Sequence, residues 1–242
     1  MTSKTDTKTR TKRSVRAEPA RDTAAASTRG RPRGSRNAAA PAPYHHGALH
    51  EALLAAAERI LERDGLVGLT LRAAAREAGV SHAAPTHHFG DLTGLLSELA
   101  ALGFRRFREA LLAAAATETG TGARLDAMGG AYVAFAKRYP GMFTLMFRSE
   151  RLDLTRPVLA EAMDAAGMAL AQAVGARRQE TIARDAPSLT QAADIVRAWA
   201  MVHGYAVLLL DGRLRHILAQ LPPGEDDASL LRAVLLPPKP VC

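Results

Sequence analysis

Two glycines, Gly79 and Gly90, divide the stretch TLRAAAREAGVSHAAPTHHFGDLTGLL (residues 70–96) into short segments. These helix breaks limit the possible folds more than the rest of the sequence does. Thr70 can cap the N-terminus of a helix with its hydroxyl, and Gly79 can adopt the left-handed conformation that ends one. Residues 71–78 are therefore predicted to form a helix of about two turns.

A second short helix is predicted between the two glycines. Ser81 can cap this helix, but Pro85 stands close to its start, where the missing backbone N–H can shift or strain the first turn. Asp91 then offers a cap for a longer helix. Two short helices joined by a tight glycine turn form a helix-turn-helix, whose second helix enters the major groove of DNA.

The remaining sequence is also predicted to be helical, so the fold class is all-α. Alanine and leucine are abundant, and only 5% of the residues are aromatic, so few runs could build strands. Apolar residues recur at helical spacing from Gly47, and Asp64-Gly65 should end that helix. The further predicted helices are 92–116, 123–138, 141–149, 156–183, 189–211 and 226–235.

The positive charge of the chain lies in residues 1–43. This segment has eleven basic and three acidic residues, whereas residues 44–242 are neutral overall. It lacks apolar periodicity and is predicted to be a disordered arm that suits a polyanion. Its sequence RGRP resembles an AT-hook, which lays arginines along a narrow A·T minor groove. The arginines expected to contact DNA are Arg29, Arg31 and Arg33. A generic basic tail, or an extension upstream of a true start near Tyr44, are the alternatives.

Three histidines in the second short helix raise the question of a metal or catalytic site. His87 and His88 are adjacent and point about 100° apart on a helix, so they cannot readily chelate one ion, and His82 is five positions from His87. No carboxylate or nucleophile stands at a recognisable catalytic spacing from them. We therefore expect no metal, no cofactor and no enzyme activity, and interpret these histidines as groups that contact DNA.

The run from about Leu49 to Leu96 resembles the DNA-binding domain of the tetracycline-repressor (TetR) family of bacterial regulators. The shared features are a long first helix ending in Asp-Gly, then LTLRAAAREAGVS, a short recognition helix ending in Phe, and a Gly-Asp start to the next helix. The resemblance implies a three-helix DNA-binding domain over residues 44–107, with the helix-turn-helix motif at about 70–89.

The resemblance also implies roles for individual residues. Thr70 and Ser81 would hold phosphates at helix N-termini, and Arg72 and His82 would reach base edges. Thr86, His87 and His88 would line the groove and the adjacent phosphates. The family often has a tyrosine where Thr86 stands and a lysine where Leu92 stands, which should weaken the grip on the DNA backbone. Residues 44–95 carry four arginines against six acidic residues, so we expect the basic arm to compensate.

The C-terminal part, residues 108–242, resembles the Trp-His-Gly class of TetR-family C-terminal domains. Its segment RAWAMVHGYAVLLLDG contains Trp199, His203 and Gly204, and the segment YVAFAKRYPGMFTLMF precedes it. The resemblance implies a helical domain for ligand binding and dimerisation, in which the last long helices pair with a second subunit as a four-helix bundle. Segments 156–183 and 193–210 are apolar over more than one face, which is compatible with a homodimer.

The same domain would hold a small apolar effector. The residues predicted to line this pocket are Tyr132, Phe135, Met146, Trp199 and His203. The wider set of candidates adds Met128, Met142, Phe143, Phe147, Met163 and Met168. Tyr132 and His203 would be the polar groups of a mostly apolar pocket. Ordinary core packing is the alternative, and His203 is expected to bond to a backbone carbonyl.

These features predict a cytoplasmic, nucleoid-associated protein without a membrane partner. A single cysteine, Cys242, allows no intramolecular disulfide, no uninterrupted apolar run spans a bilayer, and the N-terminus lacks a signal sequence. The function favoured is a homodimeric transcriptional regulator, a ligand-released repressor that binds a pseudo-palindromic operator in double-stranded DNA. The alternatives are an architectural protein that binds A·T-rich DNA through the arm, and a helical small-molecule carrier or enzyme that does not bind DNA.

Overall fold

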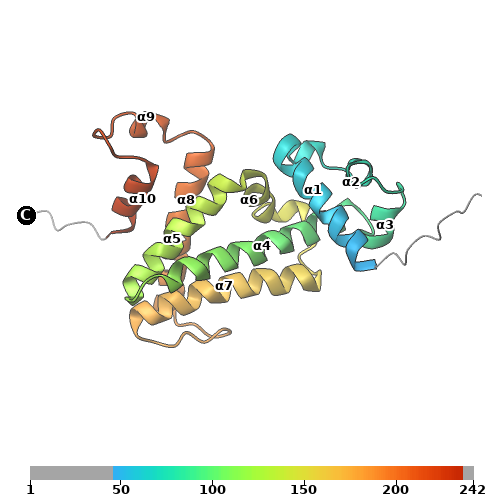
Figure 1. Cartoon of the computed structure of the whole chain (residues 1–242). Helices are drawn as coiled ribbons and strands as arrows, with labels where there is room; N and C mark the ends of the chain where they lie inside the picture. The colour runs from blue at the N-terminus through green and yellow to red at the C-terminus, as the bar shows by residue number, and fades with distance from the viewer. Residues whose placement is uncertain (1–45, 237–242) are drawn as a thin grey trace, which may run out of the picture. The chain divides into compact units, whose positions relative to one another are not determined.

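The computed structural model describes residues 46–236, which consist of helices and the loops that join them and contain no strand (Figure 1). The prediction of an all-α fold is therefore confirmed. The residues expected to contact DNA from the basic arm, Arg29, Arg31 and Arg33, lie outside the described residues. The helices are α1 (His46–Gly68), α2 (Leu71–Ala78), α3 (Ala84–Phe89), α4 (Leu92–Ala116), α5 (Thr121–Arg138), α6 (Pro140–Met146), the 3₁₀ turn η1 (Ser149–Arg151), α7 (Pro157–Arg178), α8 (Leu189–Leu210), α9 (Arg215–Leu218) and α10 (Asp227–Leu235).

The caps predicted for α2 and α4 are confirmed. Thr70 is extended, and its hydroxyl accepts a hydrogen bond from the backbone N–H of Ala73 at 3.1 Å. Gly79 ends α2 in the left-handed conformation, with φ 69°. Asp91 caps α4 by accepting from the N–H of Gly94 at 2.8 Å. Each bond spans three residues, so the local sequence alone determines these helix ends.

The prediction that Ser81 caps the next helix is wrong. α3 begins at Ala84, and its first turn has no side-chain cap. Pro85 is the second residue of α3 and is buried. Proline fits only the first turn, where its missing N–H has no helical partner, so the helix starts beside Pro85 rather than at His82. Ser81 instead accepts at its backbone carbonyl from the N–H of Ala84, at 3.1 Å.

Replacing Thr70 with alanine is expected to lower the free energy of unfolding by about 1 kcal/mol, because the N–H of Ala73 loses its acceptor at the start of α2. Thr70→Ser keeps the hydroxyl and should unfold at nearly the wild-type urea concentration. Urea unfolding followed by circular dichroism measures both variants. Equal midpoints for Thr70→Ala and Thr70→Ser would show that the cap contributes no stability.

Other helix ends also differ by a few residues from the prediction, most clearly those of α1 and α7. The helix α1 is interrupted at Gly65, with φ 68°, where the sequence predicts its end, and continues to Gly68. The helix α7 ends at Arg178 rather than at residue 183, because Gln179 adopts the left-handed conformation with φ 57°. The N–H of Glu180 then bonds back to the carbonyl of Gly175 at 2.9 Å, which closes the helix.

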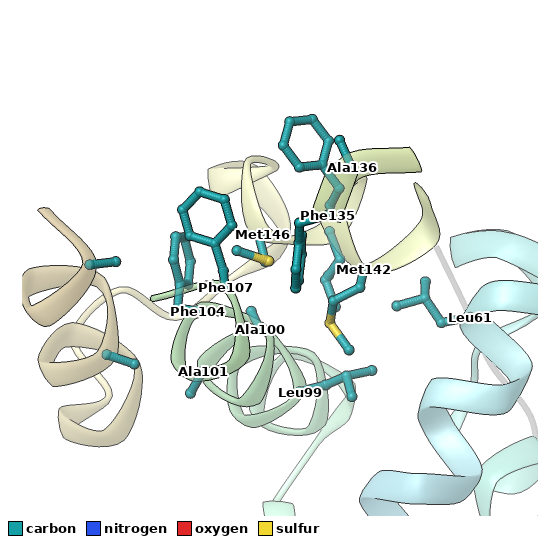
Figure 2. Close-up of a cluster of buried hydrophobic side chains, with 14 of the residues drawn as sticks. Leu61, Leu99, Ala100, Ala101, Phe104, Phe107, Phe135, Ala136, Met142 and Met146 are labelled. Atoms are coloured by element: carbon teal, nitrogen blue, oxygen red, sulfur yellow. The ribbon is translucent and has the colours of Figure 1, made fainter. Parts of the chain in front are cut away.

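The core is organised around α4, which packs against α5 and α7 and also contacts α1, α3 and α6. Figure 2 shows its buried Leu99, Phe104 and Phe107 among side chains from α5 and α6. The helix runs without a break through residue 107, where the sequence analysis places the domain boundary. Leu61 of α1 lies beside Met142 of α6 in the same view, so the buried core continues from the helix-turn-helix into the C-terminal helices.

Candidate functional site

The outer face of α2 and α3 carries six of the residues predicted to contact DNA. Burial of the opposite face positions them: Ala74, Ala75, Pro85 and Phe89 pack inward and fix the angle between the two short helices. Side chains on the other face are left to solvent. The residues exposed there or in the preceding turns are Thr70, Arg72, Ser81, His82, Thr86 and His87.

His88 differs from the other two histidines of this region because it is half-buried. Its ring lies 5.9 Å from the ring of His50 on α1, 6.2 Å from Phe89 and 5.6 Å from His87, measured between centroids. His88 therefore packs between α3 and α1, whereas His82 and His87 are the imidazoles that face outward. Among residues 46–236, no three His, Cys, Asp or Glu side chains gather closely enough to hold a metal ion.

A polar bridge, here called the Arg156 bridge, joins α7 to the recognition helix. It comprises Arg156, Glu98, His50 and the backbone carbonyl of Phe89. The guanidinium of Arg156 donates to Glu98 Oε1 at 2.5 Å and to the Phe89 carbonyl, the last residue of α3, at 2.9 Å. The other oxygen of Glu98 accepts from His50 Nε2 of α1 at 2.6 Å. Both Arg156 and Glu98 are less than one third exposed.

Close packing at Gly94 makes the Arg156 bridge possible. A Cβ at this position would lie 2.0 Å from the Phe89 carbonyl oxygen and 2.6 Å from an Arg156 nitrogen. Only glycine leaves room there for the guanidinium to reach the end of α3. Ser97, which directly precedes Glu98 on α4, is fully buried. Its hydroxyl donates to the carbonyl of Thr93 and accepts from the N–H of Asp153.

A second link joins α1 to α6. The carboxylate of Glu62 accepts hydrogen bonds from the backbone N–H groups of Gly141 at 3.1 Å and Met142 at 2.8 Å. These are free donors at the N-terminus of α6, so the negative charge of Glu62 also meets the positive end of the helix dipole. Neither Glu62 nor Arg156 was predicted from the sequence to be functional, since their partners lie 58 to 80 residues away.

The C-terminal helices line a partly open cavity of about 1010 Å³, at the upper end of the range for small-molecule sites. Of the five residues predicted to form an effector pocket, Tyr132, Met146 and Trp199 line it, and Phe135 and His203 do not. Phe135 is buried beside Phe107, with ring centroids 5.3 Å apart. The wider set of candidates contributes Met128, Phe147 and Met163 to the lining, together with residues that the sequence analysis did not single out: Phe104, Phe107 and Leu111 of α4 and Leu235 of α10.

Two residues of the Trp-His-Gly motif meet at one hydroxyl on the cavity wall. His203 Nδ1 lies 2.8 Å from the hydroxyl of Tyr132, and Trp199 Nε1 donates to the same oxygen at 3.3 Å. The expected backbone-carbonyl partner of His203 is thus replaced by a side chain of α5. Burial raises the pKa of Tyr132 and lowers that of His203, so both are uncharged near neutral pH. Gly204 takes no part in this contact, since a Cβ at its position would meet nothing within 4 Å.

The outer side of α8 is apolar and largely open. An exposed stripe follows the helix at intervals of three or four residues: Ala193, Val196, Ala200, Val207 and Leu208, with the half-buried Gly204 between them. By length and composition α8 could cross a membrane, and only 17% of its most apolar window is buried. No such segment was expected from the sequence, which has no uninterrupted apolar run long enough to span a bilayer. An apolar face that its own core does not cover is typical of an interaction surface.

Two family profiles match the chain in succession. Residues 53–99 match the profile described as bacterial regulatory proteins, tetR family, and residues 125–234 match the profile described as tetracyclin repressor-like, C-terminal domain. The first covers most of α1 through the start of α4, and the second covers most of α5 through α10, a segment that lines the cavity together with α4. No curated protein matches the chain.

Several solved structures resemble the fold. A protein with unknown function from Rhodococcus sp. RHA1 is 37% identical, with a TM-score of 0.64, and the match covers 80% of this chain and 94% of that one. A TetR family transcription regulator from Marinobacter aquaeolei VT8 is 16% identical, with a TM-score of 0.52, over 78% and 94% of the two chains. FadR from Bacillus subtilis, in complex with stearoyl-CoA, is 14% identical, with a TM-score of 0.57, over 77% and 95%. The last two show the fold alone.

Proposed function

Because the chain belongs to the TetR family and is a DNA-binding regulator of transcription, we propose that it is a homodimeric repressor released from its operator by a small apolar molecule. The observation that carries this proposal is the Arg156 bridge: one side chain at the start of α7, a helix that lines the cavity, holds the last carbonyl of the recognition helix. A change of α7 on ligand binding thus has a direct route to α3.

Operator contact is assigned to the exposed face of α2 and α3. Arg72 and His82 would read base edges in the major groove, and Thr70, Ser81, Thr86 and His87 would contact the groove walls and phosphates. His88 contributes less directly, because it packs against α1. The basic arm, with Arg29, Arg31 and Arg33, would add affinity through phosphates or an A·T-rich minor groove. Binding to chromosomal DNA would make the protein a cytoplasmic, nucleoid-associated regulator.

The exposed stripe of α8 is proposed as the dimer interface. Its small residues, Ala193, Ala200 and Gly204, would let two copies of α8 approach closely about a twofold axis. Val196, Val207 and Leu208 would then be removed from water. Two recognition helices carried by such a dimer would meet half-sites about 34 Å apart, which requires a pseudo-palindromic operator.

Ligand release is proposed to follow from a shift of population. A molecule in the cavity contacts α4, α5, α7, α8 and α10, and it favours whichever arrangement of these helices the cavity accommodates best. Since Arg156 and Glu62 fix α7 and α6 to the helix-turn-helix, that arrangement also sets the position of the recognition helices. A ligand of equal affinity for both arrangements would release nothing.

Selection of bound fragments from genomic DNA by the purified full-length protein tests this proposal. We expect enrichment of a pseudo-palindrome, and Arg72→Ala and His82→Ala should each relax base preference at defined symmetric positions, by about 1–3 kcal/mol per contact. Arg105→Ala, an exposed arginine on α4, is the matched control and should leave the motif unchanged. Enrichment of A·T-rich DNA without a motif would favour the architectural alternative, and no enrichment at all would refute DNA-binding regulation.

A further inference from the structure

The lining of the cavity is polar at one end and apolar elsewhere. Along α7 it forms a continuous apolar stripe: Met163, Ala166, Gly167, Leu170 and Val174. The stripe then reaches Arg177 and Arg178, about 21 Å from Met163 along the helix. The end of the cavity near α6 and η1 is lined by Met146, Phe147, Leu152 and Leu154. Every charged lining residue belongs to the other end. These charged residues are Asp126, Arg177, Arg178, Asp194 and Arg197.

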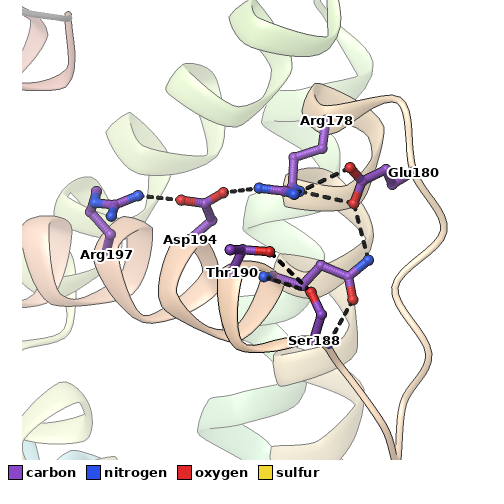
Figure 3. A network of polar contacts seen from close by, with 7 residues as sticks. Arg178, Glu180, Ser188, Thr190, Asp194 and Arg197 are labelled. Atoms are coloured by element: carbon purple, nitrogen blue, oxygen red, sulfur yellow. Dashed lines mark hydrogen bonds and ion pairs between the residues drawn. The ribbon is translucent and has the colours of Figure 1, made fainter.

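The two carboxylates at the charged end already have cationic partners. Asp194 accepts from both Arg178 and Arg197, as Figure 3 shows. The Arg178 guanidinium, followed by that of Arg197, holds the pKa of Asp194 below its usual range, so this residue is ionised at neutral pH. Arg178 also donates to Glu180 through Nε and its second terminal nitrogen, at 3.1 and 3.2 Å. Each of its three guanidinium nitrogens therefore already donates to a carboxylate.

Arg177 and Arg197 keep unused donors. Within residues 46–236, the polar contact of Arg177 is with Asp126 at 3.7 Å, which is beyond hydrogen-bonding distance. Arg197 bonds through one nitrogen to Asp194 Oδ1, whereas Arg178 bonds to the other oxygen of the same carboxylate. A guanidinium carries five N–H donors in a planar fork that matches the two oxygens of a carboxylate or phosphate. Three arginines and two aspartates line this end, and the third carboxylate nearby, Glu180, is bonded to Arg178 and does not line the cavity.

We propose that the mostly apolar effector also carries an anionic head group, so that it is an elongated anionic amphiphile. Its apolar chain would lie along the α7 stripe, and its oxyanion head group would bind Arg177 and Arg197 at the charged end of the cavity. The inference rests on the proposed ligand-released function and specifies the ligand class of the same site. It differs from a purely apolar effector because it demands a terminal negative charge, and from a cationic drug because the two carboxylates nearby are already paired with guanidinium groups.

The single tryptophan of the chain provides the assay. Trp199 lines the cavity, so its fluorescence reports occupancy without DNA and without a coupled reaction. Four probes share one tail and differ in the head: tetradecanoate, tetradecyl phosphate, tetradecanol and tetradecylamine, each titrated below its micellar concentration into the full-length protein. We expect the two anions to bind about tenfold more tightly than the alcohol, in line with one charge-assisted contact at a half-exposed site. Comparing the two anions distinguishes a carboxylate from a phosphate head.

Two substitutions localise the head group. Arg177→Gln and Arg197→Gln should each reduce the preference for anions over tetradecanol severalfold. Arg184→Gln removes the same charge from an arginine that pairs with Asp164 and does not line the cavity, and it should leave the preference intact. Thermal melts check that all three variants are folded.

Equal binding of all four probes, preference for tetradecylamine, or no binding of any probe would overturn the proposed ligand class. Equal loss in the Arg184→Gln control would also overturn it, because a general charge effect would then explain the preference. Operator binding by the same preparation is measured separately. A protein that binds its operator but none of the probes remains a regulator with another effector, so the two proposals fail independently.

Discussion

Replacing Ala200 with glutamate is expected to convert the protein into a monomer and to weaken operator binding by about a hundredfold or more. Ala200 is exposed in the middle of the α8 stripe, one turn from Val196 and one turn from Gly204. In the proposed twofold dimer, two new carboxylates would meet near the axis, buried and without cationic partners, which costs several kcal/mol. A monomer holds one half-site at a time, so it loses the gain in affinity that comes from binding both.

Sedimentation velocity and fluorescence anisotropy with a labelled operator measure the two effects of Ala200→Glu. Ala113→Glu introduces the same side chain on the exposed side of α4 and is the matched control. It should remain dimeric and bind the operator as the wild type does. A dimeric Ala200→Glu protein with unchanged operator affinity would place the subunit interface away from α8.

The parts of the fold that the sequence predicts are those determined by neighbours along the chain. Thr70, Gly79 and Asp91 each act on a backbone group within five residues, and all three behave as predicted. Ser81 shows where this reasoning fails even locally. A good capping residue and a proline compete for the start of α3, and the proline, which is buried, determines the outcome. The sequence contains both signals but does not rank them.

The contacts that the sequence could not predict join residues far apart in the chain. His203 was expected to bond to a backbone carbonyl, yet its partner is the hydroxyl of Tyr132, 71 residues earlier. Phe135 satisfies the same pattern as Tyr132, one helical turn away, but it faces Phe107 rather than the cavity. A stripe of aromatic residues identifies a packed helix face. Which of its members border empty space depends on how α4, α7 and α8 are placed around it.

The Arg156 bridge also joins residues that are far apart in the chain, so the sequence indicates it only weakly. Pro157 predicts the start of a helix, so Arg156 is recognisable as a residue at a helix N-terminus. Such a position favours an acidic or small polar residue rather than an arginine. This mismatch is explained by the tertiary partners of Arg156, Glu98 and the carbonyl of Phe89, which lie on α4 and α3.

Arg156→Met is expected to destabilise the protein by about 2 kcal/mol, because it leaves two partly buried acceptors without their donor. Glu98 would keep only His50, and the Phe89 carbonyl at the end of α3 would lose its bond to a charged group. Methionine keeps most of the apolar stem, so the loss reports the hydrogen bonds rather than packing. The backbone amides near Gly90 should also exchange with solvent faster, since the end of α3 is no longer held. Urea unfolding and hydrogen exchange measure the two effects.

A double-mutant cycle distinguishes the energy of the Arg156–Glu98 contact from the effect of a general loss of charge. Glu98→Gln and Arg156→Met should be less than additive, with a coupling of at least about 0.5 kcal/mol, because both remove the same contact. Arg151→Met, at an exposed arginine in η1, changes the charge equally and should alter neither stability nor exchange near Gly90. Additive effects in the cycle would mean that the Arg156–Glu98 contact contributes no coupling between α7 and α4. In that case the link to the recognition helix would rest on the bond from Arg156 to the Phe89 carbonyl, or on Glu62 and α6.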